Sequence, residues 1–328
     1  MSDRTSNAYL VEGSRSEYHL IDCGPDTDAN WARLESTLAR RGASVANVGS
    51  VTVTHGHFDH SGMATRISRA SGGTIRVHEA DLTLMTLGRS YGGKDPERLL
   101  RDWGVPSDRL AELISVSSSH IPQGPPANIK LLRDGEDLGI SGRTLIVLAT
   151  PGHTPGHVCV IDREHSIAFV GDHVLPEENP GVGLGGISDR NPMVDYLRAL
   201  DALDAENVRL GLPGHGSPIN DLPERTEAIR AHHLRRGREV AAASKTTASV
   251  WEIAQRVRWS RGWSALGGVH LFSALHQIAQ HMARSSGNAD VYNATPALDE
   301  FSDLVSRRTQ NFSDQRKFNR STSATSAD

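Results

Sequence analysis

The stretch Thr54-His55-Gly56-His57-Phe58-Asp59-His60 places three imidazoles and one carboxylate within six residues. Histidine and aspartate are costly to bury unless each polar atom finds a partner. A divalent metal is such a partner, because it takes neutral imidazole nitrogen and carboxylate oxygen as direct ligands. The sequence therefore predicts a metal site at this stretch.

The residues on either side of this stretch indicate a strand that leads into a helix. Val51-Thr52-Val53-Thr54 is rich in β-branched residues, which is typical of a buried strand. The residues that follow are typical of the start of a helix, which we expect to span about residues 62–70. Candidate ligands at such a turn sit on a rigid scaffold and stay open to substrate.

Three later segments repeat the pattern of an apolar strand followed by a histidine or an aspartate beside glycine. The residues after these strands are Thr150-Pro151-Gly152-His153, Gly171-Asp172 and Pro213-Gly214-His215. Three strands that end in this way indicate candidate ligands that converge on one edge of a sheet.

Length and composition set the broad class of protein. The chain has 328 residues, of which 37% are hydrophobic and 23% charged, an ordinary composition for a soluble protein. This length is enough for one large α/β domain and a smaller appendage. The formal net charge of -4 gives no electrostatic reason to expect a polyanionic partner.

The cysteines and the lengths of the apolar runs indicate the cellular compartment in which the protein is expected. Cys23 and Cys159 lie in apolar, strand-like surroundings, and buried free thiols are favoured over a disulfide. The polar residues 2–7 lack the apolar core of a signal peptide, and no apolar run approaches the ~20 residues that span a membrane. We therefore expect a cytoplasmic protein with no membrane partner.

The pattern of elements predicts three regions. Strands and helices alternate over residues 1–222, which indicates an α/β layered domain. Within it, residues 79–126 have helical patterns separated by glycine and proline, and we expect a helical insertion that is either surface decoration or a lid. Residues 223–305 are helical throughout and predict a small second domain. Residues 306–328 are polar and poor in aromatics, which predicts a disordered tail.

Four motifs occur together in this sequence: HGHFDH at 55–60, PGHTPGH at 151–157, Gly171-Asp172 and PGHG at 213–216. In this order they resemble the metallo-β-lactamase superfamily of hydrolases, and Leu20-Ile21-Asp22 matches the first motif of that family. The resemblance covers about residues 8–220, and its motifs are specific when taken jointly. It implies an α/β fold of the αβ/βα four-layer sandwich type, with a two-metal site at one edge.

The resemblance also implies which residues bind the metals. Its ligand set in this sequence is His55, His57 and His153 for a first metal, Asp59, His60 and His215 for a second, and Asp172 as the bridge between them. The resemblance also implies that Asp22 orients a ligand imidazole without binding the metal itself.

The chemistry of these residue types agrees with two metal ions. Three imidazoles and a hydroxide complete a tetrahedral zinc, and a further carboxylate suits a five-coordinate second metal. Two metals about 3.5–4 Å apart hold a bridging hydroxide as nucleophile. Asp59 and Asp172, which help hold the metals around that hydroxide, are the candidate catalytic residues. We expect zinc, with iron or manganese left open.

The bridging Asp172 and the absence of a cysteine ligand favour glyoxalase II-type thioesterases, lactonases and related ester hydrolases over true β-lactamases. The segment 191–216 and the helical C-terminal part resemble a branch with a winged-helix-like C-terminal domain, which includes β-lactamase-like protein 2. The resemblance therefore implies a hydrolase of a small acyl substrate, namely a thioester, a lactone or an ester.

Two alternatives remain open. The winged-helix-like segment and the run Arg235-Arg236-Gly237-Arg238 would suit a metallo-nuclease that acts on single-stranded RNA, but a solvated helix face is the simpler interpretation of this run. Nucleic acid is therefore a disfavoured partner. A non-catalytic protein whose helical domain serves homodimer formation or partner binding is the other alternative, and the intact ligand set argues against it.

The remaining histidines receive structural interpretations. His157 and His173 lie beside candidate ligands, where a supporting role and simple packing both remain open. His232 and His233 lie in a charged helix and are expected at the surface. His270, His276 and His281 are expected to pack, because their spacing does not place them on one helix face. The glycine-rich residues 181–186 are expected to form a flexible pocket loop.

Overall fold

The computed structural model describes residues 5–14, 17–87, 95–117, 128–185, 190–260 and 262–286. These residues belong to one compact unit, Met1–Tyr292. The expected disordered tail at 306–328 lies outside the described residues, as does the last part of the expected helical domain.

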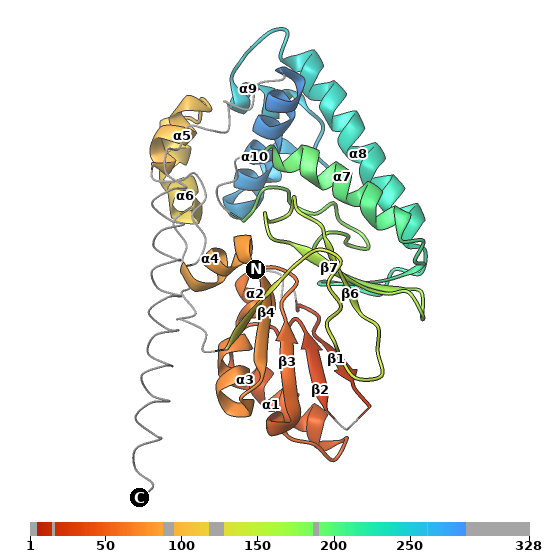
Figure 1. Cartoon of the computed structure of the whole chain (residues 1–328). Coiled ribbons are helices and arrows are strands. Elements are labelled where there is room, and N and C mark those ends of the chain that lie inside the picture. Colours follow the sequence, from red (N-terminus) through yellow and green to blue (C-terminus); the bar gives the residue numbers. More distant parts are fainter. Residues whose placement is uncertain are drawn as a thin grey trace, which may run out of the picture. The chain divides into compact units, whose positions relative to one another are not determined.

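The first half of the chain forms a five-stranded sheet in the order β1-β2-β3-β4-β5 (Figure 1). Its strands are β1 (Tyr9–Glu12), β2 (Tyr18–Ile21), β3 (Val48–Thr52), β4 (Thr74–His78) and β5 (Ile129–Leu132). The first pair is antiparallel, and the strands from β2 onwards run parallel to one another. All four residues of β2 are buried, as is typical of a parallel strand that is covered on both faces.

A second, four-stranded sheet follows in the order β6-β7-β8-β9. Its strands are β6 (Ile146–Ala149), β7 (Val158–Asp162), β8 (Ile167–Gly171) and β9 (Leu210–Pro213). Strands β6, β7 and β8 pair antiparallel, and β9 runs parallel to β8. Strands β3, β6, β8 and β9 each lead into one of the predicted ligand loops, so the two sheets together position the candidate site.

Three hydrophobic cores show that the elements stack in four layers. Leu38 of α1 (Asp28–Ala39) and Ile67 of α3 (Ala64–Ser71) pack on one face of the first sheet. Residues of both sheets, among them Ile21 and Val160, form a second core between the sheets. Leu200 of α7 (Pro192–Ala205) packs on the far face of the second sheet. This helix-sheet-sheet-helix order is the predicted αβ/βα sandwich.

Capping residues fix where the covering helices begin and end. Thr27 accepts a hydrogen bond from the backbone N–H of Asn30 at the start of α1. Asn191 caps α7 in the same way, and Pro192 occupies its first turn, where no intrahelical N–H bond is lost. Helix α3 ends at Gly72, whose φ of 75° is favourable for glycine.

A separate hydrophobic core joins the other helices. The helices around it are α5 (Pro96–Asp102), α6 (Ser107–Ser117), α8 (Leu222–Ala243), α9 (Val250–Arg256) and α10 (Gly268–Ser286). Leu100, Leu113, Val240, Ile253 and Leu275 contribute one buried side chain each. Helices α5 and α6, together with α4 (Glu79–Leu87), belong to the stretch predicted as an insertion. Because they share a core with the C-terminal helices, a domain boundary near residue 222 stays a prediction.

The described part of the C-terminal region is helical, as the sequence predicted. Across residues 222–260 and 262–286 the structure has helices and a short 3-10 turn, Trp263–Ala265, and no strand. The winged-helix label therefore stays a prediction. No helix among the described residues is long and apolar enough to cross a membrane. Cys23 and Cys159 are buried free thiols, as expected.

One expectation about α8 is wrong, and another holds only in part. His233 is buried and packs edge-on against the ring of Tyr196, with centroids 5.4 Å apart. Arg236 is also buried: its guanidinium lies 4.2 Å from the Trp259 ring and donates a hydrogen bond to the carbonyl of Arg258 (2.6 Å). Although α8 has many charged residues, one stripe along it is buried and packs against other helices. The arginine run is therefore only partly a solvated face.

Candidate metal centre

The structure brings the predicted ligand residues together from five positions along the chain. They lie in the loop after β3, in α2 (Phe58–Ser61), and in the loops after β6, β8 and β9. Groups of side chains able to hold a metal ion among the described residues are His55, His57 and His153; His55, His60 and Asp172; and Asp59, His60 and His215. The seven residues predicted from the sequence therefore form one continuous cluster.

The first group contains three buried imidazoles whose nitrogens face one another. Nδ1 of His57 lies 2.9 Å from Nε2 of His55 and 3.1 Å from Nε2 of His153. Donor atoms at about 2.0–2.1 Å from a tetrahedral metal are about 3.3 Å apart by geometry. The nitrogens are thus close to the spacing that a shared metal ion requires.

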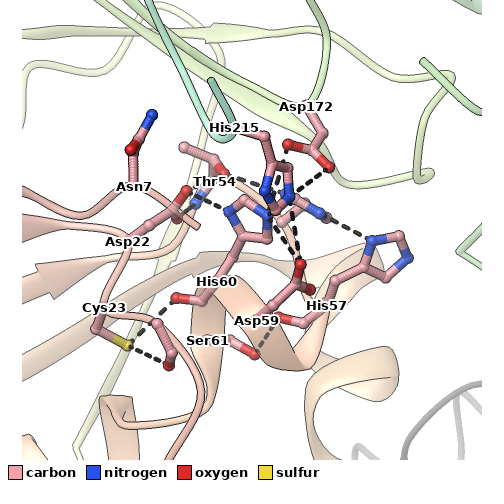
Figure 2. A network of polar contacts seen from close by, with 12 residues as sticks. Asn7, Asp22, Cys23, Thr54, His57, Asp59, His60, Ser61, Asp172 and His215 are labelled. Carbon is pink, nitrogen blue, oxygen red and sulfur yellow. Dashed lines mark hydrogen bonds and ion pairs between the residues drawn. The ribbon is translucent and has the colours of Figure 1, made fainter. Parts of the chain in front are cut away.

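The second group combines two imidazoles with a carboxylate. Nε2 of His60 lies 3.2 Å from Nε2 of His215, and Oδ2 of Asp59 lies 3.3 Å from the latter atom. Figure 2 shows Asp59 and Asp172 approaching His215 from two sides. Because α2 begins directly after His57, Asp59 and His60 lie on this short helix.

The carboxylate of Asp172 reaches both groups. Its Oδ2 lies 3.5 Å from Nε2 of His215 and 3.7 Å from Nε2 of His153, and its Oδ1 lies 3.5 Å from Nε2 of His60. Oδ1 is buried and has no hydrogen-bond partner within the described part of the chain. A buried carboxylate oxygen without a donor is costly, and a metal ion between the groups would satisfy it.

In three of these histidines the outer ring nitrogen faces a backbone carbonyl. Nε2 of His57 lies 2.9 Å from the carbonyl oxygen of Leu184, and Nδ1 of His153 lies 2.6 Å from that of Gly181. Nδ1 of His215 lies 3.2 Å from the carbonyl oxygen of Thr5. A carbonyl only accepts hydrogen bonds, so each of these nitrogens carries a ring proton, and the inner nitrogen is the one that can bind a metal.

The other two imidazoles are oriented through Asp22. Its Oδ2 accepts a hydrogen bond from Nδ1 of His60 (2.8 Å) and another from the Thr54 hydroxyl (2.8 Å). Because the hydroxyl donates its proton to Asp22, it accepts one from Nδ1 of His55, 3.1 Å away. In all five histidines the outer nitrogen therefore lies beside an acceptor, and the inner nitrogen faces the cluster, where a cation would join these nitrogens.

The charged side chains at the site also favour a bound cation. Burial alone would lower the pKa of His60 and of His215, but the neighbouring carboxylates raise these values to about 9 and about 10. Burial would raise the pKa of Asp59 and of Asp172, but the histidines around them hold both well below the usual range. Without a metal, protons on His60 and His215 balance these carboxylates, and a divalent ion would replace them.

Supporting contacts include two that the sequence did not indicate and one that it left open. The glycine-rich loop was expected to be a flexible pocket loop, yet its carbonyls at Gly181 and Leu184 fix two ligand rings. His157 is buried, and its Nε2 accepts the backbone N–H of Asp172 at 3.2 Å. No residue type signals a backbone carbonyl contact in advance, so only the fold reveals these partners.

The fold and the site together define a family. A model of the metallo-β-lactamase superfamily matches residues 1–215. The stacked sheets and the His-x-His-x-Asp-His stretch after β3 agree with this match. The chain belongs to the metallo-β-lactamase superfamily. Its fold and its cluster of histidine and aspartate residues indicate a site for divalent metal.

Similar proteins of known structure extend the likeness over most of the chain. A metallo-β-lactamase family protein from Thermus thermophilus is 30% identical with a TM-score of 0.67, covering 86% of this chain and 89% of that one. A β-lactamase domain protein from Burkholderia ambifaria has a TM-score of 0.69 at 23% identity, covering 86% of this chain and 83% of that one. The second likeness concerns the fold alone.

Two curated relatives show a more distant similarity. The lactamase-like protein nscB of Arthroderma otae is 28% identical over 242 residues, which are 74% of this chain and 60% of the relative. The atrochrysone carboxyl ACP thioesterase of Aspergillus fumigatus is 25% identical over 238 residues, which are 73% of this chain and 59% of the relative. The chain thus spans about three fifths of the length of these relatives.

Proposed function

We propose that this protein is a hydrolase that uses two divalent metal ions, with zinc expected, to cleave an acyl substrate. The observation that supports it best is the set of five imidazoles, each with its outer ring nitrogen beside a hydrogen-bond acceptor and its inner nitrogen facing the cluster. Two carboxylates complete the donor set, and the donor spacing fits ions bound side by side.

Each of these side chains has a distinct task in the proposed site. His55, His57 and His153 would hold one ion, and Asp59, His60 and His215 the other. Asp172 would bridge them, because its two oxygens face both groups. Ions bound there would polarise the acyl carbonyl and supply a hydroxide nucleophile at neutral pH.

The neighbouring residues would keep this donor set in place. Asp22 and the carbonyls of Gly181 and Leu184 hold rings at fixed angles, which limits reorganisation during the reaction. His157 holds the backbone of Asp172 through its N–H. Burial of most of these groups keeps water from competing for the same hydrogen bonds.

Among acyl substrates, a thioester is the class that we favour. Two relatives of this chain, at 25% and 29% identity, are named atrochrysone carboxyl ACP thioesterases. The described ligand groups contain no cysteine, and Asp172 lies near histidines of both groups, where it would bridge two ions. By the resemblance drawn from the sequence, this combination favours thioesterases and lactonases over true β-lactamases. Oxygen esters and lactones are therefore the comparison substrates.

The nuclease alternative loses part of its motivation. Arg236 pairs with Glu239 (3.0 Å) and stacks on Trp259, so its guanidinium is engaged inside the protein. Two arginines of the run, Arg235 and Arg238, remain exposed. We therefore keep a small acyl compound as the substrate in the proposal.

A substrate comparison with a metal count tests the proposal. The zinc-loaded protein is assayed with a thioester, an oxygen ester and a lactone that carry similar acyl groups. We expect thioester cleavage that disappears, together with bound metal, in His57→Ala and persists in His270→Ala, whose histidine is exposed on α10. Absence of cleavage in the loaded protein, or full activity of His57→Ala, would overturn the proposal.

A further inference from the structure

Asp81, in the first turn of α4, touches both loops that supply the first group of imidazoles. Its Oδ2 accepts hydrogen bonds from the backbone N–H of Gly56 (2.8 Å) and from the hydroxyl of Thr154 (2.6 Å). Its Oδ1 accepts the backbone N–H of Gly156 at 2.7 Å. The side chain is fully buried, so all three bonds are shielded from water.

Two of these donors lie next to candidate metal ligands in the chain. Gly56 lies between His55 and His57, and Thr154 follows His153 directly. One carboxylate therefore ties together the two chain segments that present all three imidazoles of the first group. The segments are about 100 residues apart in sequence, so their spacing depends on contacts of this kind.

Two glycines show how closely α4 fits against these loops. A Cβ atom at Gly56 would lie 2.7 Å from the backbone oxygen of Asp81. A Cβ atom at Gly156 would lie 2.7 Å from the backbone nitrogen of Asp81 and 2.7 Å from its Oδ1. Side chains at either position would push the helix start away, and the absence of a Cβ permits the approach.

The second group is held by contacts outside α4, one of which, Asp22, also supports His55 through Thr54. Asp22, at the end of β2, binds His60, and the carbonyl of Thr5 faces His215. Neither contact involves α4. A disturbance at Asp81 is therefore transmitted first to His55, His57 and His153.

We propose that Asp81 is a positioning residue that sets the spacing of these three histidines and thereby the affinity for one of the two metals. The inference rests on the proposed two-metal site. The carboxylate acts through the loops, and it lies outside the groups of side chains able to hold a metal.

Asp81→Asn is the variant that isolates this role. An amide has a single acceptor oxygen, so in either orientation its NH2 group faces the backbone N–H of Gly56 or of Gly156. One loop then moves to relieve the contact. Loss of a partner that orients metal ligands typically weakens metal binding by about 10–100-fold.

A matched pair at Thr154 gives a milder test should Asp81→Asn fail to fold. Thr154→Val removes the hydroxyl bond to Asp81 with little change of shape, whereas Thr154→Ser retains a hydroxyl. We expect weaker binding of one metal in the valine variant and recovery in the serine variant.

The control is Asp162→Asn, at the end of β7 away from the site. Asp162 is buried as well, and its Oδ1 accepts the backbone N–H of His165 at 3.1 Å. This variant loses a comparable buried carboxylate and leaves the ligand loops untouched. It therefore separates a general loss of stability from an effect on metal binding.

The experiment titrates each metal-free full chain with Co²⁺ and records the d–d absorption, with Zn²⁺ competition against a chelator as the second measurement. We expect two ions per wild-type chain, one of them bound about 10–100-fold more weakly in Asp81→Asn, and both unchanged in Asp162→Asn. Equal weakening of the binding of both ions, or unchanged binding in Asp81→Asn and Thr154→Val, would overturn the proposed role of Asp81. Either result would leave the proposed function standing. A wild-type chain that binds no metal would overturn the proposed function, and this inference with it.

Discussion

Replacement of Asp22 by asparagine probes the contact that orients His60. The Asp22 carboxylate accepts three hydrogen bonds, from the backbone N–H of Thr54, from its hydroxyl and from Nδ1 of His60, each at 2.8 Å. Asp22 has a φ of 57°, a conformation that asparagine tolerates far better than alanine does. Asp22→Asn therefore changes the hydrogen bonds and the charge with little backbone strain.

The expected magnitude follows from counting donors and acceptors. Asparagine offers one acceptor oxygen to donors that lie on both sides of the carboxylate, so at least one buried donor faces an NH2 group. Such a donor costs about 1–3 kcal/mol of stability. If the NH2 group faces His60, the ring proton moves to Nε2 and removes the lone pair meant for the metal. We expect about 10–100-fold weaker binding at the second group.

Two assays measure these effects separately. Urea unfolding of the metal-free protein gives the stability loss, and competition with a chelator gives the affinity of each metal. Asp162→Asn again serves as the buried control. If Asp22→Asn keeps both the wild-type stability and the wild-type affinity for two metals, the inference that Asp22 fixes the His60 ring is refuted.

Three further predictions concern pH, the glycine-rich loop and metal removal. In the metal-free protein the pKa values of His60 and His215 are raised to about 9 and about 10, so the stability they contribute is fully present below about pH 6.5 and is lost as the pH rises through 9 to 10. Urea unfolding at several pH values checks this loss, and a metal-free protein that gains stability over this interval contradicts it. Gln280→Ala removes the donor to the carbonyl of Val182 (2.8 Å), which should cost about 1 kcal/mol and speed hydrogen exchange across 181–185; unchanged exchange there contradicts the contact. Free metal at about 1,000 times its dissociation constant should raise stability by about 4 kcal/mol, and equal melting curves with and without a chelator would speak against a bound metal.

The sequence predicted the features that depend on residue type at strand ends. The seven candidate ligands and Asp22 come from short motifs, and the structure brings all of them together. Their assignment as ligands came from the resemblance of these motifs, taken jointly, to the metallo-β-lactamase superfamily. The four-layer sandwich followed from the same resemblance, and the three cores confirm it.

Other features depend on tertiary contacts that a sequence pattern does not record. Asp81 stands in an ordinary helix start, and nothing in its neighbours indicates that its carboxylate meets loops from two distant parts of the chain. The contacts of Gly181 and Leu184 run through backbone carbonyls, which every residue possesses. His233 was misplaced because its helix is highly charged overall.

The burial of His233 has a physical reason that is visible only in the structure. The buried residues of α8 follow one another at three- and four-residue steps and form a stripe that includes polar members; they are Leu222, Thr226, Ile229, His233, Arg236 and Val240. A search for apolar periodicity passes over such a stripe, because half of its residues are polar or charged. Along this stripe α8 packs against α7 and α10, the helices that lie beside it in Figure 1.

Anomalous diffraction at the zinc edge from crystals of the zinc-loaded chain tests the two-metal site most directly. We expect two peaks. One should lie about 2.0–2.1 Å from the inner nitrogens of His55, His57 and His153, and the other at a similar distance from those of His60 and His215. Absence of peaks at the cluster, or a single peak that leaves one of the two groups without a metal, would contradict the two-metal site.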